Sequence, residues 1–248
     1  MPKTWQTVSE AEVDATPDQV WQAIATGPGL DGWFSGSNEI QPGPSGVLHS
    51  TTAGFSDDLS VTGWEPPQRV AYRSSQAEGG RFYALEWLVE GSSGATVLRC
   101  VASGFIPGDD WEAEFESLQA GGAMYFQSLV QYLTYFRGRT ALVVDAFGPP
   151  CEDAEQAWQV LTGALGLAET GAIKVGDQVR LTPTGCAPIE GVAYATEGHM
   201  LAIRASDGLY RFLRAGPMSL VSHRIFSTDA PQQQTEEAWQ GWLGQLFA

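Results

Sequence analysis

Apolar and polar positions near the start of the chain first follow the period of a strand and then that of a helix. Residues 4–13 alternate loosely, which predicts a strand. Thr16 and Pro17 then stand where an N-cap and a first helical residue are favoured. The apolar face of this helix consists of Val20, Trp21, Ile24 and Ala25. The pattern predicts that the helix ends at Gly27-Pro28-Gly29 and that a short helix follows over 30–34.

Residues 39–105 show the shorter period of strands, interrupted by turns rich in proline and glycine. In one segment Leu85, Trp87 and Val89 alternate with Glu86 and Glu90, which indicates an antiparallel sheet with one face toward a core. The expected strands are 38–41, 46–51, 59–64, 69–74, 82–90 and 96–105.

A long apolar stripe over residues 110–137 predicts the helix that closes the first half of the chain. Its first turns are acidic and its end, near Arg137, is basic, as the helix dipole favours. Gly121 and Gly122 interrupt the stripe, and each glycine costs about 1 kcal/mol relative to alanine within a helix. Such a pair predicts a bend or the close approach of another segment.

The second half of the chain repeats this order of elements. The heptapeptide DQVWQAI at 18–24 recurs 137 residues later as EQAWQVL at 155–161. Each copy follows a strand and a proline-bearing turn, and each precedes further strands and a terminal helix, expected here at 233–247. The repeat predicts a tandem α+β protein with domains at 1–138 and 139–248, and a chance match of seven positions is the weaker alternative.

Charge and hydropathy exclude several classes of partner. The net charge is −16 and the chain has only two lysines, so it lacks the cationic surface that nucleic acids and anionic lipids require. The acidic excess indicates a solvated surface or, alternatively, repulsion of anionic ligands or attraction of a basic partner. No apolar run approaches the ~18 residues of a membrane span, and the first residues lack the apolar core of a signal peptide. A soluble, cytoplasmic protein without membrane insertion is expected.

Residue types that carry metal, cofactor or covalent chemistry are sparse. The three cysteines form no CxxC pair and the three histidines have no metal-ligand spacing, so neither a disulfide framework nor a metal site is expected. The chain has no glycine-rich phosphate loop and no GxSxG elbow, and no cofactor is expected. Among the histidines, His49 on an early strand is a candidate acid or base, and a role without chemistry is the alternative.

Four motifs in the first half stand in the order and at the spacing of a known family. They are ATPDQVWQAI at 15–24, GLDGWF at 29–34, EPPQRVAY at 65–72 and GATVLRCVASGF at 94–105. Over residues 4–137 the chain therefore resembles the SRPBCC (START-like) superfamily and, within it, the heat-shock-protein ATPase-activator homologue family. The second half matches only in element order and in the helix motif around Trp158, which indicates a degenerate copy.

The resemblance implies a helix-grip fold, in which a curved antiparallel sheet wraps around a long C-terminal helix and leaves a cavity between them. It implies no single function, because the superfamily includes lipid and hormone carriers, polyketide aromatases and cyclases, and oxygenase domains. Members often carry His or another polar residue at the position of Ala102, and Gly-Trp where Gly121-Gly122-Ala123 stands here. Both departures are expected to make the cavity larger and more apolar.

Strand alternation and the resemblance together place a set of side chains around this cavity. The candidate ligand-binding residues are Trp33, Phe34, His49, Tyr72, Tyr83, Trp87, Cys100, Trp111, Phe115, Met124 and Tyr125. Such a lining suits a flat or greasy molecule, while the alternative is that these side chains pack together as a core. The expected function is binding of a hydrophobic or aromatic small molecule without catalysis.

Two other functions stay open at this point. One is a polyketide cyclase or hydrolase type of enzyme that uses His49, Tyr72 or Tyr83 as acid or base. The other is a chaperone-linked module that binds a protein through its acidic face or its second copy. A homodimer or another protein partner is compatible with each of these.

Overall fold

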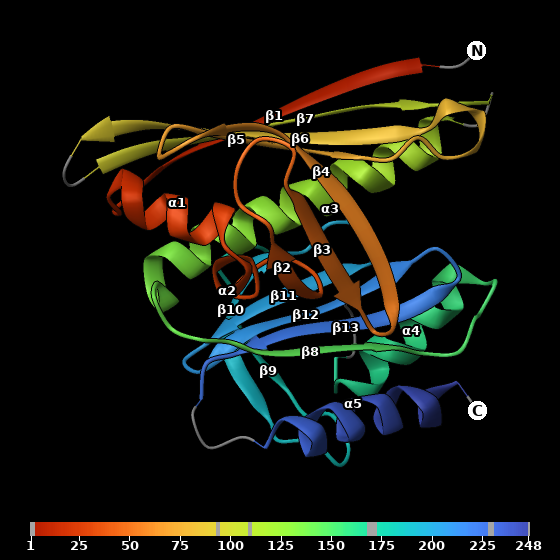
Figure 1. Ribbon diagram of the computed structural model, residues 1–248. Helices are drawn as coiled ribbons and strands as arrows, with labels where there is room; N and C mark the ends of the chain where they lie inside the picture. The colour runs from red at the N-terminus through yellow and green to blue at the C-terminus, as the bar shows by residue number, and fades with distance from the viewer. Residues whose placement is uncertain (1–2, 93–94, 109–110, 168–172, 228–230, 248) are drawn as a thin grey trace. The chain divides into compact units, whose positions relative to one another are not determined.

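The structure, a computed structural model, describes residues 3–92, 95–108, 111–167, 173–227 and 231–247. The chain divides into two compact units, Met1–Thr140 and Ala141–Ala248 (Figure 1). Each unit is described by itself below. None of the helices in the described ranges is both long enough and apolar enough to cross a membrane.

The first unit begins with strand β1 (Lys3–Val13) and helix α1 (Pro17–Ala25). Thr16 caps α1 as the sequence predicts, because its Oγ1 accepts a hydrogen bond from the Gln19 backbone N–H at 3.3 Å. The Gln19 side chain accepts one in return from the Thr16 N–H at 2.9 Å, which completes a capping box. The short helix that follows, α2 (Gly27–Leu30), begins earlier than the expected 30–34. It does so because Thr26 caps it directly, accepting from the Gly29 N–H at 3.1 Å.

The remaining strands of the first unit are β2 (Ser37–Ile40), β3 (Val47–Thr52), β4 (Phe55–Glu65), β5 (Arg69–Ser74), β6 (Phe82–Ser92) and β7 (Ala95–Ile106). The sheet has the order β1-β7-β6-β5-β4-β3-β2 in the described residues, and every neighbouring pair is antiparallel. The first strand therefore pairs with the last, from Lys3 opposite Ile106 to Val13 opposite Thr96. Strand β4 begins four residues before the expected 59–64, since Ala53 and Gly54 form a tight turn with φ values of 46° and 88°.

Helix α3 (Trp111–Gln131) ends in a π-helical turn, η2 (Tyr132–Phe136). Figure 1 shows α3 running along the strands β1, β7 and β6 of its sheet. The expected bend or close approach at the glycine pair is wrong. The helix is continuous through Gly121 and Gly122, and a Cβ built on either residue would meet no atom within 4 Å. These glycines leave open space beside the helix instead of admitting another segment.

The second unit contains β8 (Leu142–Phe147), α4 (Ala154–Ala164), β9 (Gln178–Leu181), β10 (Ile189–Ala195), β11 (Met200–Ala205), β12 (Gly208–Ala215), β13 (Met218–Ile225) and α5 (Gln232–Leu246). Its sheet has the order β8-β13-β12-β11-β10-β9 in the described residues. As in the first unit, a helix follows the first strand, the first strand pairs with the last, and a long helix closes the unit.

The predicted tandem helix-grip fold is confirmed by this shared topology. The helices α1 and α4 begin 137 residues apart, which is the offset of the sequence repeat. Asp153 caps α4 as Thr16 caps α1, since Asp153 Oδ1 accepts from the Gln156 N–H at 2.9 Å. Trp21 and Trp158 occupy the same position in the two helices, and both are buried.

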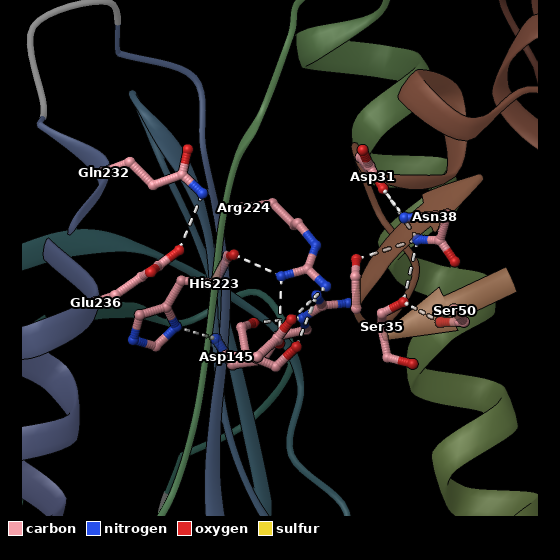
Figure 2. Close-up of polar contacts among 12 residues, drawn as sticks. Asp31, Ser35, Asn38, Ser50, Asp145, His223, Arg224, Gln232 and Glu236 are labelled. Atoms are coloured by element: carbon pink, nitrogen blue, oxygen red, sulfur yellow. Dashed lines mark hydrogen bonds and ion pairs between the residues drawn. The ribbon is translucent and has the colours of Figure 1, made fainter. Parts of the chain in front are cut away.

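The second unit packs aromatic side chains between its sheet and helix α5. The rings of Trp239 and Trp242 lie 5.8 and 6.3 Å from that of Phe212, and the His223 ring lies 4.5 Å from Trp239. Burial, with help from the nearby Arg211 and Arg224, lowers the pKa of His223 well below its usual range, so this imidazole is neutral at physiological pH. On the opposite face of the sheet Arg224 pairs with Asp145 at 3.3 Å (Figure 2).

The two caps provide a matched prediction on stability. We expect Thr16→Ala and Asp153→Ala each to lower the free energy of unfolding by about 1 kcal/mol, because each leaves a helix N–H without its acceptor. Urea denaturation of the two variants measures this loss. Thr184→Ala, at an exposed position in a turn, is the control and should change the free energy by less than about 0.5 kcal/mol. If the cap variants are no less stable than this control, Thr16 and Asp153 do not stabilise α1 and α4 as N-caps.

Candidate ligand-binding cavity

A cavity of about 160 Å³ lies inside the first unit, between α3 and the strands β1, β6 and β7. Its lining residues are Thr7, Val8, Ser9, Trp33, Phe34, Leu85, Trp87, Cys100, Ala102, Gln119, Gly122, Ala123, Tyr125 and Phe126. All of them belong to residues 7–126, so the cavity is formed by the first unit alone.

Strand pairing explains the sheet wall of the cavity. Leu85 lies opposite Ala102 and Trp87 opposite Cys100 in the pairing of β6 with β7, so the four side chains share one face. On the other side of β7, Thr7 lies opposite Ala102 and extends this face onto β1. The small side chain of Ala102 lies near the middle of this wall and leaves space that a larger residue would occupy.

The second wall comes from helix α3. Gln119, Gly122, Ala123 and Phe126 recur at the spacing of one helix face. Gly122 and Ala123 are the small members of this face, and the space beside Gly122 is empty to at least 4 Å from an added Cβ. The helix therefore comes close to the sheet without filling the space between them.

The loop after α2 supplies the aromatic end of the cavity through Trp33 and Phe34. The Trp33 ring is buried, and its Nε1–H donates to the Ala23 carbonyl oxygen at 2.9 Å. It packs edge-to-face on Trp87, with ring centroids 5.4 Å apart, and Phe34 lies 5.3 Å from Tyr125. These contacts join the loop to both walls.

A polar network holds this loop in place (Figure 2). Asn38 Nδ2 donates to Asp31 Oδ1 at 3.0 Å and to the carbonyl oxygens of Ser35 and Gly36. The Ser50 hydroxyl donates to the same Ser35 oxygen at 3.3 Å. Because Asn38 is buried, these bonds satisfy its side-chain NH2 group, which would otherwise be costly to bury, and they fix the segment that carries Trp33 and Phe34.

The volume of the cavity limits what it can hold without rearrangement. Pockets for drug-sized ligands measure roughly 300–1,000 Å³, whereas an engineered apolar cavity of about 150 Å³ binds benzene. At about 160 Å³ the cavity matches a single aromatic ring or a short aliphatic chain. Both Trp87 and Phe126 line the cavity and supply aromatic contact area to such a ring.

The cavity lining offers few groups that could carry a charge or transfer a proton. Among the described residues that line the cavity, none is Asp, Glu, Lys, Arg or His. Burial raises the pKa of Cys100 to about 12, so its thiol stays protonated and is a poor nucleophile at physiological pH. Thr7, Ser9 and Gln119 offer hydrogen-bonding groups. No group of three His, Cys, Asp or Glu side chains that could hold a metal ion is found in the described part of the chain.

Five of the sequence-predicted ligand-binding residues lie together in this lining: Trp33, Phe34, Trp87, Cys100 and Tyr125. His49 does not. Its neighbours on β3, Leu48 and Ser50, are buried, so alternation turns His49 to the opposite face of the sheet. There its Nδ1 lies 2.6 Å from Asp58 Oδ1, and both side chains are largely exposed. The idea that His49 looks into the cavity as an acid or base is therefore corrected.

The two candidate tyrosines also lie outside the lining. The Tyr72 hydroxyl is buried and donates to the Ile24 carbonyl oxygen at 2.8 Å, and burial raises its pKa. The Tyr83 hydroxyl donates to Asp57 Oδ2 at 2.8 Å, and its pKa is raised by burial and then by this carboxylate. A hydroxyl that keeps its proton and already donates it has no capacity to act as a general base.

Trp111, Phe115 and Met124 pack with neighbours outside the lining. Phe115 has its ring 5.9 Å from Trp5 and 6.1 Å from Trp111, and Met124 is buried in the core. Ordinary core packing therefore describes Met124, whereas Trp111 and Phe115 are half-buried and pack on each other outside the lining. The lining also contains residues that were not among the candidates, chiefly Thr7, Ser9 and Gln119. The signal for the two β1 residues was the alternation of 4–13, which places them on one face with Trp5.

Cys100 gives a prediction that checks the burial of the sheet wall. We expect a thiol reagent to leave Cys100 unmodified in the folded protein, even at about pH 10, because its pKa lies near 12. Unfolding in urea should expose it. Mass mapping of the modified peptides separates it from Cys151 and Cys186, which are only partly buried. Modification of Cys100 at the rate of Cys151 in the folded state would show that the wall is open.

A seven-stranded sheet that packs on a terminal helix, with a cavity between them, defines a helix-grip protein of the SRPBCC type. The family model described as polyketide cyclase / dehydrase and lipid transport matches residues 4–127, which is half of the chain. The chain belongs to this family. The comparison with curated proteins gave no match.

The chain is also similar to several solved structures. The Aha1 dimer from Colwellia psychrerythraea is 21% identical, with 54% of this chain and 99% of that one covered at a TM-score of 0.43. DynU16, from the dynemicin biosynthetic locus, is 19% identical over 97% and 96% of the chains, at a TM-score of 0.43. The di-domain ARO/CYC BexL from the BE-7585A biosynthetic pathway is 10% identical over 98% of each chain, at a TM-score of 0.47.

Proposed function

We propose that the first unit binds an uncharged small molecule with an aromatic or short aliphatic body in the cavity between α3 and β7, without converting it chemically. The observation that carries the proposal is the lining, which is largely apolar and aromatic and contains no charged side chain among its described residues. Family membership supports an apolar ligand, because the family description joins cyclases and dehydrases with lipid transport.

The physical chemistry of the lining favours uncharged ligands. Transfer of an ionised group into a space of this kind is costly unless a partner charge meets it, and the lining supplies none. A neutral ring leaves water and gains dispersion contacts with Trp33, Trp87 and Phe126 on several sides. A single hydroxyl on that ring has Thr7, Ser9 or Gln119 as hydrogen-bond partners.

Binding has more support than catalysis. General acid–base chemistry needs a group that gains or loses a proton near neutral pH within reach of the ligand. Cys100 holds its proton up to about pH 12, and His49, Tyr72 and Tyr83 are outside the lining. The described lining therefore offers the cyclase or hydrolase alternative no acid or base that titrates near neutral pH. The cytoplasmic location and the homodimer stay predictions from the sequence.

Titration calorimetry with matched probes tests the proposal. We expect phenol and toluene to bind with dissociation constants between micromolar and millimolar, which for their roughly seven non-hydrogen atoms requires about 0.6–1.2 kcal/mol per atom, below the ceiling of about 1.5 for very small ligands. Benzoate, which has the same ring and a negative charge, should show no measurable binding. Absence of heat with phenol and toluene, or equal affinity for benzoate, would refute a neutral apolar site.

A further inference from the structure

A second concave site lies in the second unit, and it shares no lining residue with the first-unit cavity. It is an open groove of about 600 Å³. Four segments of the described chain form it, namely the turn before β10 with the start of that strand, the turn between β11 and β12 with its flanking strand residues, the end of β13, and the first half of α5. Every lining residue falls between Gly185 and Trp239, so the groove belongs to the second unit alone.

Two aromatic side chains form the floor of this groove. Trp239 is 4% exposed, and its ring is held edge-to-face by His223, Phe212 and Trp242. Tyr210, 7% exposed, packs on His223 with ring centroids 5.0 Å apart. Because these contacts bury nearly all of both rings, only a small part of each lines the groove, and that part needs no ordering when a ligand binds.

A carboxylate stands at the edge of this floor. Tyr210 Oη donates to Asp207 Oδ2 at 3.1 Å, which holds the Asp207 side chain at the groove. Burial, and then Asp207 itself, raises the pKa of Tyr210, so this partner is a neutral hydroxyl and does not cancel the charge of the carboxylate. The other acid of the lining, Glu190, is already paired with Arg180 at 3.1 Å on the outer part of the sheet.

The charges of the groove lining and of the whole chain favour a positively charged ligand. Among the described residues that line the groove, none is Lys, Arg or His. The whole chain carries a net charge of −16, which repels anions over a longer range. The Asp207 carboxylate at the groove attracts a cation and can form a hydrogen-bonded charge pair with an ammonium group.

We propose that this groove binds a small organic ammonium ion, with the charged nitrogen on Asp207 and the apolar body against Trp239 and Tyr210. Such a ligand differs in charge from the neutral molecule proposed for the first unit. The second unit is therefore a binding module in its own right, and the two sites of the tandem protein take ligands of different chemistry. This inference does not rest on the function of the first unit.

Calorimetry at low salt with 2-phenylethylamine, 2-phenylethanol and 3-phenylpropionate tests the proposed preference. These titrations use the Ala102→Leu variant, in which the first-unit cavity is filled from its sheet wall. We expect the ammonium probe to bind roughly fivefold or more tightly than the alcohol, and the anion to show no binding. Added salt should weaken the ammonium probe alone. Equal affinities for the three probes would overturn the proposal.

Two variants then locate the site. Asp207→Asn removes the charge and keeps an oxygen for Tyr210, and Ala238→Lys places a cation at an exposed groove position on α5. Each should weaken the ammonium probe by roughly fivefold or more and leave the alcohol unchanged. Glu237→Gln, exposed and outside the lining, is the charge-matched control. Ammonium binding that survives both groove variants would place the site elsewhere and refute the assignment. Equal affinity of the wild type and of Ala102→Leu for 2-phenylethylamine would show that this probe binds independently of the first-unit cavity.

Discussion

The variant Ala102→Leu is expected to lose the binding of phenol and toluene while the protein stays folded. Alternation along β7 turns residue 102 toward the cavity, next to Leu85 and Thr7 on the adjoining strands. Three added carbon atoms would occupy a large part of a cavity of about 160 Å³, and the ring would have no room left. We expect affinity to fall by about tenfold or more, as calorimetry can measure. Filling an existing space also avoids the strain of overpacking a solid core.

The matched control for this variant is Ala84→Leu. Ala84 lies on the neighbouring strand β6, opposite Ser103, and so belongs to the other face of the same sheet. The same three carbon atoms are added there without entering the cavity, and ligand affinity should stay within about twofold of the wild type. If Ala102→Leu binds phenol as the wild type does, the ligand does not occupy this cavity. If both variants lose binding, the effect comes from general damage to the sheet.

The largest effect on stability is expected from Trp33→Ala. The Trp33 side chain is fully buried and packs on Trp87, and its indole N–H satisfies the Ala23 carbonyl oxygen. Truncation removes this packing and leaves a buried acceptor without its donor. We expect the free energy of unfolding of the first unit to fall by about 3–5 kcal/mol, the usual range for removal of a buried aromatic side chain. Hydrogen exchange of the β6 and α1 amides reports on this unit directly.

Phe55→Ala is the control for the truncation of an aromatic residue. Phe55 begins β4 in the same unit, and its side chain is 65% exposed. Its loss should change the free energy of unfolding by less than about 0.5 kcal/mol. A Trp33→Ala variant as stable as Phe55→Ala would mean that the loop of residues 31–38 does not anchor the aromatic end of the cavity.

The order of elements and the tandem repeat could be predicted from the sequence because local signals specify them. Thr16 and Pro17 mark the start of α1 by their own side-chain and ring chemistry, and the same offset leads to Asp153 and α4. The alternation of Leu85, Trp87 and Val89 gave the inward face of β6 correctly, since Trp87 and Val89 are buried. These features depend on neighbours only a few residues away.

The features that the sequence predicted poorly depend on longer-range geometry. The sequence predicts the strand that contains His49 but not the face of the sheet on which its side chain lies. A shift of one residue in the strand pairing turns a side chain to the other face. Thr7 and Ser9 are not predicted from the sequence because they reach the cavity through the pairing of β1 with β7, a strand about ninety residues later in the chain. The sequence predicts a bend or a close neighbour at Gly122, whereas this glycine borders empty space.

Crystallography of the protein soaked with 4-bromophenol tests the central claim most directly, because bromine gives an anomalous signal that locates the ring. The account predicts bound ligand in the first-unit cavity between α3 and β7, beside Trp87 and Phe126. Soaked Ala102→Leu crystals should show no ligand there. A first unit whose interior is packed solid between α3 and β7, or a ligand found only outside it, would contradict the account.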